Sequence, residues 1–166
     1  MRGFWVALIL PWLSFTVNAQ VPQGWQVRSS HPTFSRLLAE GYARSETFRG
    51  LVVRLNESDV VVYVEPELAP RLGLRGYLMS DVVIGGGKRF LRIRLYPFGN
   101  VNTLIARLGH ELQHAVEVAD APGVRDEDTF SQHFVRIGRV DCGATCYETD
   151  AAGQMQRAVA RELRAR

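Results

Sequence analysis

Residues 102–120 read NTLIARLGHELQHAVEVAD, and this stretch decides how the chain folds. Asn102 is a suitable N-cap for a helix, and the run Ala121-Pro122-Gly123 is typical of a helix end. We therefore expect a helix over residues 102–120 that packs one face on a core. That face is an apolar stripe at helical spacing: Leu104, Leu108, Leu112, Ala115 and Ala119.

His110 and His114 stand away from this apolar stripe, with Glu111 directly after the first histidine. Side chains four residues apart lie on the same face of a helix, so both imidazoles can reach one metal ion. Glu111 points about a quarter-turn away, where a carboxylate can contact a metal-bound water without being a ligand. Residues 110–114 therefore specify two metal ligands and a general base.

The remaining pattern predicts an α+β domain. A first helix is expected at about 33–45, and further helices at about 127–137 and 146–164. Strands are predicted at 51–55, 59–65, 76–84 and 89–95, and the run Gly85-Gly86-Gly87-Lys88 is expected to be a hairpin turn. The order gives an N-terminal helix, a small sheet of three to four strands, the motif helix and C-terminal helices.

The first nineteen residues have the pattern of an export signal. Arg2 provides a positive start, residues 4–17 form an apolar run, and Val17-Asn18-Ala19 is a small-residue cleavage site. The run is shorter than a membrane-spanning helix needs, and Pro11 interrupts it. We expect cleavage near Ala19 and a secreted or periplasmic protein.

Residues 20–166 are long enough for one domain with its own core. Lys and Arg total 20 against 17 Asp and Glu, and the charges are scattered along the chain. This balance does not suggest binding to nucleic acid. No segment after the signal is apolar enough to suggest a membrane span, so we expect no membrane association after cleavage.

A catalytic zinc ion usually has three protein ligands, and two histidines with one glutamate are a standard set. Glu148 is the preferred third ligand, because it is in register with apolar positions of the predicted last helix. Those positions are Ala152, Met155, Val159 and Leu163. The stretch 145–148 also fits a capping box, in which Glu148 would bind the N-cap backbone instead.

Glu117 is the rival ligand, seven residues after His110 on the same helix face. A ligand one turn beyond His114 would overreach a metal held between the two histidines. We therefore expect Glu117 to accept the ring N–H of a histidine and fix its orientation. His133 and Asp141 remain as further candidates.

The stretch 109–115, GHELQHA, with Glu117 following, resembles compact zinc metallopeptidases of the gluzincin type, and more narrowly small exported bacterial proteins built around this motif. The resemblance implies a zincin-like fold and a third zinc ligand from a Glu on a downstream helix, often with Ala three residues later, as in Glu148 and Ala151. Metzincins are not a close model, because Glu117 and Asp120 stand where those proteins have a Gly and a third His.

These features predict an exported zinc-dependent metallohydrolase, most simply a peptidase. Zinc would activate a bound water, and Glu111 would take its proton and pass it to the leaving amine. Tyr147 and His133 are candidate oxyanion donors. The substrate would be a peptide or protein, including cell-wall peptides, aligned on a sheet edge such as Arg89–Leu95.

The alternative is a secreted zinc-binding module without turnover that binds a protein or cell-envelope partner. The intact Glu111 argues against this alternative, whereas the small size of the domain favours it. Cys142 and Cys146, four residues apart in an exported chain, are expected to form a disulfide. It would stiffen the segment before Glu148 and add little stability, because the loop that it closes is short.

Overall fold

The computed structural model describes residues 24–69, 74–140 and 147–165. The helices are α1 (Pro32–Arg44), α2 (Glu46–Asn56), α3 (Val101–Ala119), α4 (Glu127–Ile137) and α5 (Asp150–Arg164). The strands are β1 (Val27–Arg28), β2 (Val60–Pro66), β3 (Gly76–Leu78), β4 (Val83–Gly85), β5 (Lys88–Leu95), β6 (Arg139–Val140) and β7 (Tyr147–Glu148). The expected export signal and the Cys142–Cys146 disulfide lie outside the described residues.

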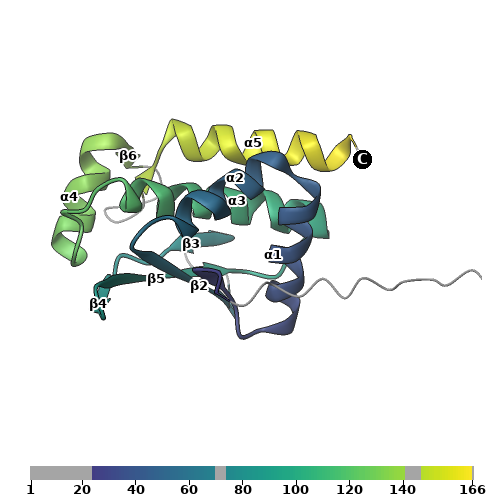
Figure 1. The fold of residues 1–166 in the computed structure, drawn as a ribbon. Coiled ribbons are helices and arrows are strands. Elements are labelled where there is room, and N and C mark those ends of the chain that lie inside the picture. Colours follow the sequence, from purple (N-terminus) through teal and green to yellow (C-terminus); the bar gives the residue numbers. More distant parts are fainter. Residues whose placement is uncertain (1–23, 70–73, 141–146, 166) are drawn as a thin grey trace, which may run out of the picture.

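The elements form an α+β domain, as predicted (Figure 1). α1, α2 and α3 contact the main sheet, and α5 packs along the side of α3 that faces away from it (Figure 1). α4 and the β6–β7 ribbon lie together at one end of this stack. Within the described residues, no helix combines the length and the apolar character needed to cross a membrane.

The main sheet has five strands in the order β1-β2-β5-β3, with β4 also paired to β5. β1, β2 and β5 run parallel, whereas β3 and β4 are antiparallel to β5. The sheet exceeds the three to four strands predicted because the short β1 was not foreseen and residues 76–84 form two strands. Gly86 and Gly87, both with positive φ, join β4 to β5 and confirm the predicted hairpin turn.

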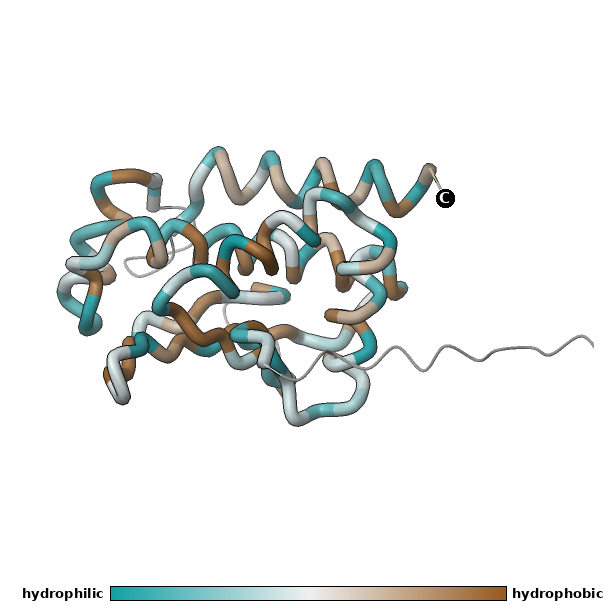
Figure 2. Tube along the Cα trace, viewed as in Figure 1, coloured by the Kyte–Doolittle hydropathy of each residue, from teal (hydrophilic) through white to brown (hydrophobic). Residues whose placement is uncertain are grey.

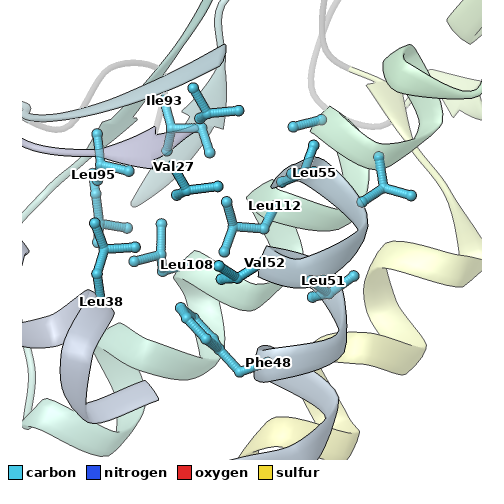
Figure 3. Close-up of a cluster of buried hydrophobic side chains, with 14 of the residues drawn as sticks. Val27, Leu38, Phe48, Leu51, Val52, Leu55, Ile93, Leu95, Leu108 and Leu112 are labelled. Atoms are coloured by element: carbon cyan, nitrogen blue, oxygen red, sulfur yellow. The ribbon is translucent and has the colours of Figure 1, made fainter. Parts of the chain in front are cut away.

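The core lies between the sheet and the helices. Leu108 and Leu112 of α3 point toward Ile93 and Leu95 of the sheet, with side chains of α2 alongside (Figure 3). Apolar segments of the sheet and of the helices accordingly face one another (Figure 2). Buried and half-buried residues alternate along β5, so one face of this strand packs on the core.

Residues 51–55, predicted as a strand, belong to α2. The hydroxyl of Ser45 accepts a hydrogen bond from the backbone N–H of Phe48 at 3.0 Å and caps the helix. The buried residues Phe48, Leu51, Val52 and Leu55 then form one helical face. The β-branched pair at positions 52 and 53 favours a strand locally, but packing of this face on the core decides the conformation.

The last helix begins at Asp150 and not at 146. Thr149 is its N-cap, and its hydroxyl accepts a hydrogen bond from the backbone N–H of Ala152 at 3.1 Å. Glu148 therefore precedes the helix and lies in β7, paired with Arg139 of β6. The predicted capping box over residues 145–148 is wrong, as is the helical register assigned to Glu148.

Arg89 of β5 holds the C-terminal end of α3. Its guanidinium is 1% exposed and forms a two-pronged pair with Asp59, at 2.8 Å and 2.6 Å. Nη1 also donates to the carbonyl oxygens of Val118, Ala121 and Val124. Carbonyls at a helix end lack intrahelical partners, so this one side chain satisfies them and ties α3 to the sheet.

We expect Arg89→Met to lower the free energy of unfolding by about 3–5 kcal/mol, because Asp59 and the carbonyls at the end of α3 lose a buried partner. Arg92→Met is the matched control on the same strand. The Arg92 side chain is 39% exposed in its pair with Asp81, so its loss should cost less than about 1 kcal/mol. Urea denaturation measures both, and equal losses would contradict a clamping role for Arg89.

Candidate metal centre

The polar face of α3 carries a group of potential metal ligands. One donor atom from each of His110, Glu111 and His114 lies within 4.8 Å of the other two. The two imidazole centroids are 4.9 Å apart, with the ring planes at 81°. In the part of the chain that the structure describes, this is the one such group of His, Cys, Asp or Glu side chains. Helical spacing thus brings together the residues that the sequence singled out.

Glu148 lies beside this group and comes from a different element. Its Oε2 lies 3.3 Å from Nε2 of His110. The sequence placed Glu148 beside the histidines on the last helix, whereas the structure brings it there from β7. Its role as a metal ligand stays a prediction, now with a carboxylate oxygen next to an imidazole nitrogen.

Glu117 orients His114. Its Oε2 accepts a hydrogen bond from Nδ1 of His114 at 2.8 Å, because an ionised carboxylate can only accept. Its Oε1 accepts one from the hydroxyl of Thr149 at 2.7 Å. This is the role expected for Glu117 from the sequence. It fixes the tautomer of His114 and leaves Nε2 of that ring available for a metal.

Burial and neighbouring charges set the protonation of the cluster. Burial, with the charge of His114 adding to it, lowers the pKa of His110 to about 4, so this imidazole is neutral at pH 7. Burial acts against the charged form of His114, but the hydrogen bond to Glu117 and the nearby carboxylates outweigh it and raise the pKa of His114. A metal at His114 therefore competes with a proton that the nearby carboxylates favour, while His110 already offers its lone pair.

Glu111 lies between α3 and the edge strand β3. Burial raises the pKa of Glu111 to about 7, although a hydrogen bond from the backbone of Leu78 acts in the opposite direction. A Cβ at Gly76 would lie 3.2 Å from Oε1 of Glu111 and 3.0 Å from Cδ1 of Leu95. Glycine at position 76 thus leaves room for the carboxylate.

The structure places the other sequence candidates around this cluster. His133 is buried, with Nδ1 3.4 Å from Nη2 of Arg136, and is not part of the ligand group. Tyr147 stacks on Phe134, which also contacts the ring of His114. The oxyanion role of Tyr147 or His133 stays a prediction, and Asp141 lies outside the described residues.

Sequence reasoning missed four contributors to the cluster. Thr149, 4% exposed, was identifiable as a Thr before an acidic first turn, which is an N-cap pattern. Gly76 and Leu78 contact Glu111 only through the sheet, so no local signal marks them. Gln156 of α5 acts to raise the pKa of His110, and it reaches this ring only through the packing of α5 on α3, which is equally non-local.

No protein-family model, curated protein or solved structure matches the chain. The fold and the cluster together therefore define it as an α+β protein with a candidate metal centre on α3. The cluster could hold a metal ion, and the choice of metal rests on the chemistry of its donors.

We expect Glu111→Gln to stabilise the metal-free protein at pH 8. The pKa of Glu111 in the folded protein, about 7, exceeds its ordinary value of 4.5. The folded protein therefore loses stability as the pH rises from about 4.5 to about 7, because Glu111 ionises more easily in the unfolded chain. A neutral amide removes that loss, and the free energy of unfolding should rise by roughly 2–3 kcal/mol.

Urea denaturation at pH 8 and pH 4 measures this effect, which should vanish at pH 4, where Glu111 is protonated in both states. Glu40→Gln, at a half-exposed position on α1, is the control and should shift stability by less than about 0.5 kcal/mol at either pH. A stabilisation of Glu111→Gln that does not depend on pH would contradict the buried charge.

We also expect Thr149→Val to weaken metal affinity about tenfold or more, because Glu117 loses a donor that orients it toward His114. Thr149→Ser keeps the hydroxyl and should retain the affinity. Thr129→Val removes the hydroxyl that accepts from the N-cap backbone N–H of Asp126 in the capping box of α4, and controls for the loss of a capping hydroxyl alone. Competition with a chromogenic zinc chelator gives the affinities; a loss of the same size in Thr129→Val would exclude a specific role for Thr149.

Proposed function

We propose that this chain is an exported zinc-dependent metallohydrolase of the gluzincin type that cleaves peptide bonds. The observation that carries the proposal is the approach of the Glu148 carboxylate to Nε2 of His110, within a cluster that already contains His114 and Glu111. The export signal at residues 1–19 supports secretion or a periplasmic location.

The donor set suits zinc. Two imidazole nitrogens and one carboxylate oxygen are a standard set for a catalytic zinc ion, and they leave one coordination position for water. The Glu117–His114 hydrogen bond adds the outer carboxylate that commonly orients a ligating histidine. Glu111 is assigned the base and not the third ligand, because the backbone of Leu78 holds its carboxylate toward β3.

When bound, zinc supplies a positive charge that lowers the pKa of a water molecule and polarises a carbonyl. Glu111 then accepts the proton of the attacking water at its carboxylate and delivers it to the leaving amine. In the metal-free protein burial raises the pKa of Glu111 to about 7. His110 and His114 position the reaction, with Glu117 and Thr149 holding the second ring.

Among the described residues β3 is an edge strand of the main sheet, and an extended peptide can align along its outer side. β5 is paired along both sides, so the alignment expected beside Arg89–Leu95 does not fit. Met79 and Tyr96 donate across the β3–β5 ladder, to Arg92 and Arg75 respectively. In an antiparallel pair the alternate backbone groups, those of Gly76 and Leu78, face the other way, toward a strand that would pass Glu111.

One observation favours the alternative of a zinc-binding module without turnover. The side chains of His110 and His114 are only 14% and 6% exposed, which restricts the approach of a substrate carbonyl. A protein that holds zinc for binding a partner needs no such approach. Hydrolysis of a peptide library by the zinc-loaded protein, abolished in Glu111→Gln, separates the two functions.

Zinc content tests the proposed ligand set. We expect one zinc ion per chain in the wild type, loss of zinc in Glu148→Ala, and retention in Glu111→Gln, because the base is not a ligand. Glu117→Ala should keep zinc with lower affinity, because it loses only the orientation of His114. Elemental analysis of the purified proteins measures this; retention in Glu148→Ala with loss in Glu117→Ala would move the third ligand to α3.

A further inference from the structure

Two arginines meet beside the Glu111 end of the β3 edge. Arg75 directly precedes Gly76 of β3, and Arg107 lies four residues before Glu111 on α3. Phe98 connects them: Cζ of Arg75 lies 4.9 Å from the centroid of its ring, and Nη1 of Arg107 donates to its carbonyl at 2.7 Å. Both guanidinium groups are thus held next to each other by contacts with Phe98.

Among the described residues, neither of these arginines is paired with a carboxylate. The three arginines of β5 behave differently, since Arg89, Arg92 and Arg94 each contact an Asp or Glu. Burial, with the charge of Arg75 adding to it, lowers the pKa of Arg107, which shows that the two like charges are close enough to repel. The fold therefore holds an uncompensated positive charge here.

The position of this charge relates it to the metal centre. Four residues of helix advance about 6 Å, and an extended peptide advances about 3.3 Å per residue. A strand aligned on β3 and passing Glu111 therefore reaches the two arginines about two residues from the bond at the metal. Arginine pairs of this kind bind carboxylates through charge-assisted hydrogen bonds.

We propose that Arg75 and Arg107 bind a carboxylate of the substrate peptide, about two residues from the cleaved bond, so that the protein selects acidic peptides. The proposal rests on the peptidase function proposed above and names its substrate class. The carboxylate comes either from an Asp or Glu side chain or from the C-terminus of a short peptide, and the chemistry recognised is the same.

The test uses pairs of fluorogenic peptides that differ only in Asp against Asn, with the acid moved along the positions on each side of the cleaved bond. For the wild type we expect one position at which Asp raises kcat/KM at least about tenfold over Asn. A further pair with a C-terminal carboxylate or amide distinguishes the two sources. An equal response to Asp and Asn at every position, and to both C-termini, would overturn the proposal.

The variants locate the preference. Arg75→Gln and Arg107→Gln should each reduce the Asp-to-Asn ratio of kcat/KM at least about fivefold. Arg107→Lys keeps the charge and should keep most of this ratio. Arg36→Gln removes an equal charge from the exposed face of α1 and should leave the preference unchanged. Zinc content should stay at the wild-type level throughout. A preference that persists in the Arg75→Gln/Arg107→Gln double variant overturns the proposal.

The arginine site can also be tested separately from the peptidase function. If the zinc-loaded protein hydrolyses none of the peptides, fluorescence anisotropy still measures their binding. Tighter binding of the acidic peptide by the wild type, lost in the double variant and weakened by salt, supports the arginine site by itself. Equal affinity for the Asp and Asn peptides overturns the arginine site.

Discussion

The candidate centre depends on the burial of α3 along two sides. One side places Leu108 and Leu112 on the sheet, and another lies against α5, where Gly109 allows close contact. A Cβ at Gly109 would lie 3.1 Å from a methyl group of Val159. With both sides fixed, and with Arg89 holding its C-terminal end, α3 cannot rotate about its axis. The directions of His110, Glu111 and His114 are therefore set by apolar packing before any metal is bound.

The same burial explains the charges of the cluster. Removing these groups from water opposes ionisation, which keeps His110 neutral and raises the pKa of Glu111. His114 escapes this tendency because the hydrogen bond to Glu117 and the nearby carboxylates of Glu111 and Glu148 favour its charged form. The histidine in turn lowers the pKa of Glu117 against the effect of burial. The cluster thus combines a ready lone pair, an oriented second ring and a carboxylate near neutrality. A metal cation bound at the cluster would offset the negative charge of the carboxylates around the two histidines.

The helix and the grouping of its polar side chains could be predicted from the sequence because both depend on spacing within one element. The pair His110 and His114, the apolar stripe of α3 and the role of Glu117 all follow from the helical period. α2 was missed because burial of Phe48 and its neighbours overrides the strand preference of Val52 and the residue after it. Gly76 could not be foreseen, because its contact with Glu111 exists only once β3 pairs with β5.

Glu148 lies beside His110, as the sequence suggested, although the element that carries it was predicted wrongly. A ligand on a helix takes its direction from the helical register, whereas Glu148 takes it from the backbone of β7. Three contacts hold that backbone: pairing with Arg139, the hydrogen bond from Thr149 to Glu117, and close contact with Gly138, where a Cβ would lie 2.8 Å from the carbonyl oxygen of Glu148. The Glu148 carboxylate is therefore positioned by the end of α4 and the start of α5 together. A metal at this centre would join α3 to both of these elements, so its affinity should respond to changes at Gly138 and Thr149, which are not themselves ligands.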